Sequence, residues 1–83
     1  MNQAIQVLDG CTYIGAKEAL KVDIIEGGQM LVCYICGSTE ECLTSLYFIK
    51  QFEIEEIIEL KLEQGKLNSD GEIWLTAEEI FKY

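Results

Sequence analysis

The stretch "ALKVDIIEGGQMLVCYIC", residues 19–36, predicts a β-hairpin at the centre of the fold. Leu20, Val22 and Ile24 alternate with more polar residues, and a period of two is typical of a strand. Gly27 and Gly28 then predict a hairpin turn, because glycine adopts positive φ without steric cost. The return segment, residues 29–36, is apolar on both faces, which predicts the central strand of the sheet.

Two helices are predicted after this hairpin. Ser38 with Glu41 forms an S-x-x-E capping pattern, which is typical of a helix start. A second helix is expected over residues 53–64, where isoleucine and leucine recur at helical spacing and glutamates fill the positions between them.

The two ends of the chain complete the predicted fold. Residues 4–8 and 72–75 predict short strands, residues 68–71 a turn, and Thr76 with Glu79 a second capping pattern before a terminal helix. These elements predict one domain, residues 1–83, of the α+β class. The expected architecture is a small antiparallel sheet, made of the hairpin plus N- and C-terminal strands, with two helices packed on one face.

Several short motifs along the chain resemble those of a known family. They are "MNQAI" (1–5) with Asp9, "CYI" (33–35), "IEE" (54–56) and "DGEIWL" (70–75). In these motifs the sequence resembles the short bacterial proteins of the family named domain of unknown function 1488 (DUF1488). The resemblance covers most of the chain and implies a small α+β fold. It implies no catalytic residues, because the family has no agreed activity.

Composition excludes several kinds of function. The chain has 15 acidic residues and 6 basic residues, all lysine, with no histidine and a net charge of −9. Direct binding to nucleic acid is not expected, because neutralising phosphates requires a basic face. No segment approaches the ~20 apolar residues of a membrane span, and the first ten residues lack the pattern of a secretion signal. We therefore expect a cytoplasmic protein.

The four cysteines allow three interpretations. Cys33-x-x-Cys36, with Cys11 and Cys42, allows a zinc site or a redox site. Residues three apart on a strand point to opposite faces, however, and only one C-x-x-C is present. We favour buried thiols that pack in the core, with Cys33 and Cys42 as examples, and predict no metal ligands and no cofactor.

Catalysis is not predicted either. Without histidine, a serine or cysteine nucleophile lacks its commonest base, and the chain contains no G-x-S-x-G motif and no phosphate-binding glycine loop. We predict that the protein is not an enzyme and has no catalytic residues.

The acidic segment of residues 52–64 allows two interpretations: a solvated surface that keeps the protein soluble, or a binding face for a basic partner. The predicted contact residues are Glu55, Glu56, Glu59 and Glu63, with Tyr47 and Phe52 as aromatic anchors. Most of the aromatic residues near the helices, namely Tyr47, Phe48, Phe52, Phe81 and Tyr83, are nevertheless expected in the core. The favoured function is a non-catalytic inhibitor or regulator that docks on a basic, nucleic-acid-binding protein surface.

In its acidic composition the chain resembles anti-CRISPR and DNA-mimic proteins. The alternatives are a homodimeric regulatory domain of the uncharacterised family and a structural zinc or thiol protein.

Overall fold

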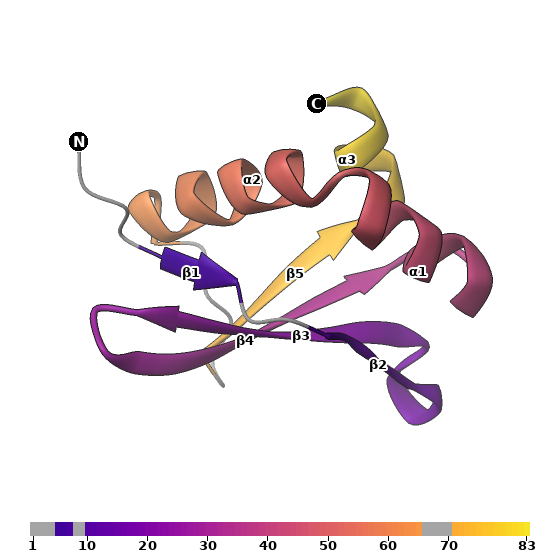
Figure 1. Cartoon of the computed structure of the whole chain (residues 1–83), viewed down its shortest axis with the longest axis horizontal. Coiled ribbons are helices and arrows are strands. Elements are labelled where there is room, and N and C mark those ends of the chain that lie inside the picture. The colour runs from indigo at the N-terminus through magenta and orange to yellow at the C-terminus, as the bar shows by residue number, and fades with distance from the viewer. Residues whose placement is uncertain (1–4, 8–9, 66–70) are drawn as a thin grey trace.

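The computed structural model describes residues 5–7, 10–65 and 71–83. In chain order the elements are β1 (Ile5–Val7), β2 (Thr12–Ile14), the 3₁₀ turn η1 (Gly15–Lys17), β3 (Ala19–Glu26), β4 (Gln29–Cys36), α1 (Glu40–Ile49), α2 (Gln51–Glu63), β5 (Glu72–Thr76) and α3 (Ala77–Lys82). The strands form one sheet, and the α-helices lie on one side of it (Figure 1). The predicted α+β class is confirmed.

The predicted hairpin forms the middle of the sheet. β3 and β4 pair antiparallel over their whole length, and Glu26 lies opposite Gln29 across the turn. Gly27 and Gly28 have φ of 57° and 84°. Positive φ at both central residues is the requirement of a two-residue turn whose twist matches that of the strands.

The sheet order is β1-β3-β4-β5, and β2 also pairs with β3. β1 pairs antiparallel with residues 24–26 and β2 with residues 19–21, so that both short strands lie along the same edge of β3. β1 falls within the strand predicted over residues 4–8, and β2 is a second short strand on the same edge. Residues 4 and 8, and most of the predicted turn at 68–71, lie outside the described residues.

The prediction of a wholly antiparallel sheet is wrong for the last strand. β5 runs parallel to β4, with Cys33 opposite Ile73 and Ile35 opposite Leu75. The reason is the long connection between them, because α1 and α2 carry the chain back across the sheet before β5 begins (Figure 1). A strand reached through such a helical crossover runs parallel to the strand it left.

The core lies between the sheet and the helices. Alternation along β3 turns Leu20, Val22 and Ile24 towards the helices, and all three are buried. The buried cluster comprises these three with Cys33, Ile35, Leu43, Leu46, Tyr47, Ile54, Ile57, Ile58, Ile73, Leu75, Ala77 and Ile80.

The helix starts only partly follow the predicted capping patterns. Thr76 and Glu79 form a complete capping box, with bonds of 3.1 Å from the Glu79 N–H to Thr76 Oγ1 and 3.0 Å from the Thr76 N–H to Glu79 Oε1. At α1, however, the cap is Thr39, whose Oγ1 accepts from the Cys42 N–H. The expected cap at Ser38 is therefore one residue too early.

α1 and α2 meet at a bend. Lys50 has φ −114° and ψ 31°, outside the helical region. Its N–H still donates to the Leu46 carbonyl, and its carbonyl accepts from the Ile54 N–H. The two predicted helices are therefore separate elements joined by one non-helical residue.

Lys61 of α2 connects this helix to both β5 and α3. Its Nζ lies 3.1 Å from Glu79 Oε2 and donates to the Trp74 carbonyl at 3.3 Å. Because β5 is the last strand of the sheet order, Lys61 occupies an acceptor on the outer edge of the sheet.

The other side of the sheet carries no α-helix in the part of the chain that the structure describes (Figure 1). We call it the open sheet face, and its apolar residues are Ile14, Ala19, Ile25, Met30, Val32, Tyr34, Cys36 and Trp74. Within the described ranges, no helix is long and apolar enough to cross a membrane.

Candidate protein-binding surface

The outer side of α2 is an acidic stripe. Ile54, Ile57 and Ile58 are buried, so the opposite side of the helix faces solvent. Residues 52, 56, 59 and 63 follow one another at spacings of four, three and four, which places them on one side of a helix. Glu55 flanks them. The structure therefore brings together five of the six predicted contact residues, Phe52, Glu55, Glu56, Glu59 and Glu63.

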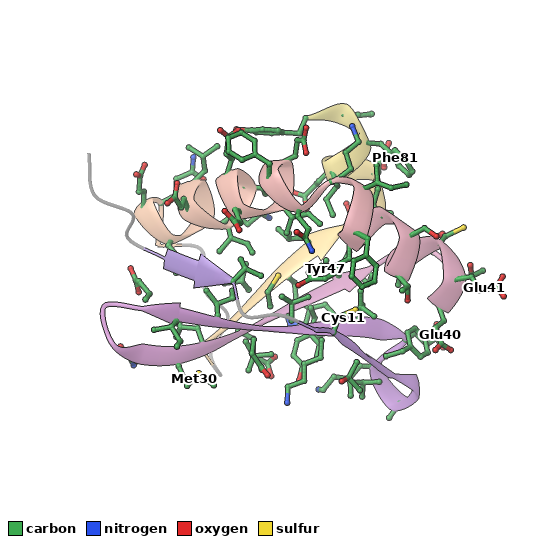
Figure 2. The ribbon with its side chains drawn as sticks, in the orientation of Figure 1. Cys11, Met30, Glu40, Glu41, Tyr47 and Phe81 are labelled. Carbon is green, nitrogen blue, oxygen red and sulfur yellow. The ribbon has the colours of Figure 1, made fainter. Side chains whose placement is uncertain are left out.

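Tyr47 is the exception, and its prediction as a surface anchor is wrong. Its side chain is 1% exposed and lies between α1 and the sheet (Figure 2). Leu43, Leu46 and Tyr47 follow the three-and-four spacing of the buried side of α1, which explains this position. The Tyr47 ring contacts the neighbouring Phe48 ring edge-on at 5.2 Å, and Phe48 is the ring that reaches solvent.

The large apolar residues are exposed mainly where the three helices meet. All three phenylalanines of the chain are mostly exposed: Phe48 at 61%, Phe52 at 67% and Phe81 at 67%. Ile49 and Tyr83 are also more than half exposed. We call these five residues the aromatic patch. The expectation that most of Tyr47, Phe48, Phe52, Phe81 and Tyr83 lie in the core is wrong, because Tyr47 alone of these five is buried.

Two observations connect the patch across the helices. Ile49 of α1 and Phe81 of α3 line one groove of about 310 Å³, whose other lining residues are Glu41, Cys42, Ser45, Leu46 and Lys50. The Tyr83 hydroxyl donates to Glu56 Oε1 at 2.8 Å. Glu56 lies one helical turn after Phe52. This hydrogen bond to a carboxylate raises the pKa of Tyr83. The C-terminus is thereby held against the acidic stripe.

Glutamates surround the aromatic patch. The three helices contain nine glutamates, two in α1, five in α2 and two in α3, against two lysines. Glu56 lies one turn after Phe52, and Glu78 lies one turn before Phe81. An apolar centre with a charged rim is the usual composition of a protein-binding surface.

The patch was only partly accessible to sequence reasoning. Phe48 lies opposite the buried stripe of α1, and this spacing was a usable signal for its exposure. Phe81 lies one residue after Ile80 and four after Ala77, which are both buried. Its spacing therefore predicts burial, and only the three-dimensional arrangement shows that the core ends before it.

The cysteines do not form a common site. Cys33 is buried on the helix side of β4, and burial raises its pKa to about 12. Cys36, three residues on, points to the other side of the sheet and donates to the Leu75 carbonyl. Among the described residues, no three histidine, cysteine or carboxylate side chains are arranged to hold a metal ion.

Cys42 differs from the predicted core thiol. It is exposed in the first turn of α1, so the expectation of burial is wrong for this residue. Hydrogen bonds with the side chains of Thr39 and Ser38 lower the pKa of its thiol. It lines the groove next to Ile49 and Phe81, where it is accessible to thiol reagents.

Comparison with known proteins supports the resemblance seen in the sequence. A protein of unknown function of the DUF1488 family from Shewanella loihica PV-4, whose crystal structure is known at 1.60 Å, has the same fold. The TM-score is 0.75 at 26% sequence identity, over 90% of this chain and 94% of that one. The chain is a DUF1488-like domain. No family model and no curated protein matches the sequence of this DUF1488-like domain.

Proposed function

We propose that this DUF1488-like domain is a non-catalytic binding module that docks its helices on a basic surface of another protein. The observation that carries the proposal is the aromatic patch beside the acidic stripe of α2. Phenylalanine is usually buried, yet all three phenylalanines here are mostly in solvent. Because exposing large apolar side chains in one place is unfavourable, such a patch usually marks a binding site.

The partner's chemistry follows from the residues around the patch. Phe52 supplies an aromatic side chain of the kind that dominates binding energy when buried at the centre of an interface. Glu55, Glu56, Glu59 and Glu63 supply negative charge around it. The complementary surface is therefore an apolar pocket bordered by lysine and arginine.

Clefts that bind nucleic acid have this basic character. A domain that occupies such a cleft acts as an inhibitor or regulator, in the manner of anti-CRISPR and DNA-mimic proteins, by exclusion rather than by catalysis. A net charge of −9 speeds association with a basic partner through long-range attraction. We place this action in the cytoplasm.

The test compares which proteins the immobilised domain retains from bacterial lysate. The baits are the wild type, Phe52→Ala and the triple variant Glu55→Lys/Glu56→Lys/Glu59→Lys, each at about 50 mM and about 500 mM salt. We expect a basic protein that the wild type retains at low salt and that both variants lose. Its dissociation constant is then measured by titration with the purified pair.

Two matched controls separate the surface from general effects. Met30→Ala removes an apolar side chain that is 61% exposed on the open sheet face. A reversal of Glu18, Asp23 and Glu26 to lysine, all outside the helices, changes the net charge by the same amount as the triple variant. Both controls are expected to retain the partner. If the wild type and all variants retain the same proteins, the helices are not the docking surface and the proposal is wrong.

A further inference from the structure

The open sheet face has a composition that its position does not explain. In a sheet with one side in water, outward positions are normally polar. Along β4, however, the outward residues Met30, Val32, Tyr34 and Cys36 are all apolar. A strand that is apolar on both faces is typical of a sheet covered on both sides.

Aromatic contacts give this face a defined surface. The rings of Tyr34 and Trp74 stack with centroids 4.8 Å apart, and Lys17 Nζ lies 5.2 Å from the Tyr34 centroid. The Trp74 indole N–H donates to Glu72 Oε1 at 3.2 Å. The polar atom of the tryptophan therefore has a partner within the chain. The Tyr34 ring itself is buried, at 7% exposure, and the apolar area open to a second molecule comes from Met30 and the partly exposed Val32 and Trp74.

The charges on this face are balanced, unlike those of the helices. Lys17 lies over the Tyr34 ring, Lys21 lies 4.0 Å from Asp23, and Glu72 is next to Trp74. Among the described residues of the strands and of η1, two positive and two negative groups are thus placed on this side. Two copies of a chain with net charge −9 repel each other through their helices, because like charges disfavour contact, but not through this face.

We infer that the open sheet face binds a second copy of the same chain. In a two-fold pair, the same surface of each copy meets the other, so Lys21 of each chain can face Asp23 of its partner. Sheets packed face to face lie about 10 Å apart with interleaved side chains. The pair then has two sheets inside and the helices on the two outer sides, where the aromatic patches remain accessible.

The outline of this side is comparable with the surface that a stable pair buries. The chain measures 33 × 24 × 22 Å along its principal axes. One side of the molecule therefore outlines at most on the order of 700 Å², close to the ~800 Å² that each partner buries in an interface of standard size.

Sedimentation equilibrium of the full chain tests this inference at about 50 mM and about 500 mM salt. We expect a species of twice the 9.4 kDa chain mass. Salt should strengthen the pair, because it screens the repulsion between two acidic chains. Met30→Asp and Val32→Asp should each weaken the pair at least about tenfold, whereas Phe52→Ala on the helix side should leave it unchanged.

Three results overturn the inference. They are a monomer at every concentration up to about 0.5 mM in both salts, an unchanged pair in the aspartate variants, and a pair lost in Phe52→Ala. If Val32→Asp does not fold by circular dichroism, Met30→Asp decides, because Met30 is mostly exposed and its replacement does not alter the core. Self-association is distinguished from partner binding through the helices by its response to salt, because high salt weakens partner binding and strengthens the pair.

Discussion

The helices and the open sheet face both have apolar side chains at the surface, mostly exposed on the helices and, apart from Met30, partly or fully buried on the sheet, and they differ in charge. The helices carry nine glutamates and two lysines around Phe48, Phe52 and Phe81. In the part of the chain that the structure describes, the open sheet face has two lysines and two carboxylates around the Tyr34–Trp74 pair. An apolar centre gives affinity to either surface, while the surrounding charge selects the partner. This difference in charge is the basis for proposing a basic protein as the partner of the helices and a second copy as the partner of the sheet.

The two surfaces are separate only if a well-packed core lies between the helices and the sheet. Replacing the buried Tyr47 is expected to affect this core most strongly. Tyr47→Ala should lower the free energy of unfolding by about 3–5 kcal/mol, because a large buried aromatic residue is lost and leaves a cavity. Urea denaturation followed by circular dichroism measures this, with Phe48→Ala as the control for the adjacent exposed ring. A loss below about 1 kcal/mol for Tyr47→Ala would show that the helices are not packed on the sheet as described.

Charge reversal on α2 tests the helix side directly. Glu55→Lys/Glu56→Lys/Glu59→Lys should weaken binding to the basic partner by about 100-fold or more at low salt, since three attractive contacts become repulsive. Titration calorimetry with the captured partner measures this. The self-association of the same variant, followed by sedimentation, should persist. Loss of both together would mean that the two surfaces are one.

Removal of a single aromatic ring should have a smaller effect. Phe52→Ala is expected to weaken partner binding about 10- to 30-fold, the range of a moderate interface hot spot. Its free energy of unfolding should change by no more than about 0.5 kcal/mol, because the side chain is mostly in solvent. Calorimetry and urea denaturation on the same sample give both values. A large loss of stability with unchanged affinity would place Phe52 in the core instead.

The smallest expected effect concerns Glu79, which contacts Lys61 at the edge of the sheet. Partial burial acts to raise the pKa of Glu79, but hydrogen bonds from Thr76 and from Lys61 outweigh it, so that the pKa lies below its ordinary value of 4.5. A carboxyl with a lowered pKa stabilises the fold above its unfolded pKa, and the contribution is lost as the pH falls through the folded pKa. The contribution should stay below about 1 kcal/mol, because the side chain is partly exposed and screened by water.

Glu79→Gln provides the measurement. The stability difference between wild type and this variant should shrink between about pH 5 and pH 3. The matched control is Glu78→Gln, since Glu78 forms only an exposed ion pair with Lys82. An equal pH response from both variants would show that the Lys61–Glu79 pair adds nothing to the fold.

Local sequence patterns predicted the elements better than their arrangement. Alternation in β3, the paired glycines at 27–28 and the Thr76–Glu79 capping box all involve neighbours in the sequence, and the structure confirms each of them. The direction of β5 was wrong because it depends on how α1 and α2 cross the sheet. A four-residue strand carries no signal for parallel or antiparallel pairing.

The contact residues were likewise predictable only where their position depends on neighbours in the sequence. The acidic stripe was predictable because the helical period places Phe52 and the glutamates on one side of α2. Tyr47 was misplaced because aromatic residues serve equally in cores and at interfaces. Phe81 and Tyr83 join the patch only because β5 and α3 return beside α2, through contacts such as Tyr83 with Glu56.

The contact of Lys61 with the Trp74 carbonyl has a consequence for how the protein behaves at high concentration. The outer edge of a sheet is a template for strands of other molecules, and apolar strands with free edges grow into fibres. A lysine that occupies an edge acceptor, and adds a charge there, opposes such growth at β5. Assembly of this chain should therefore stop at a closed pair, and the variant Lys61→Met should be more prone to amyloid-like aggregation than the wild type.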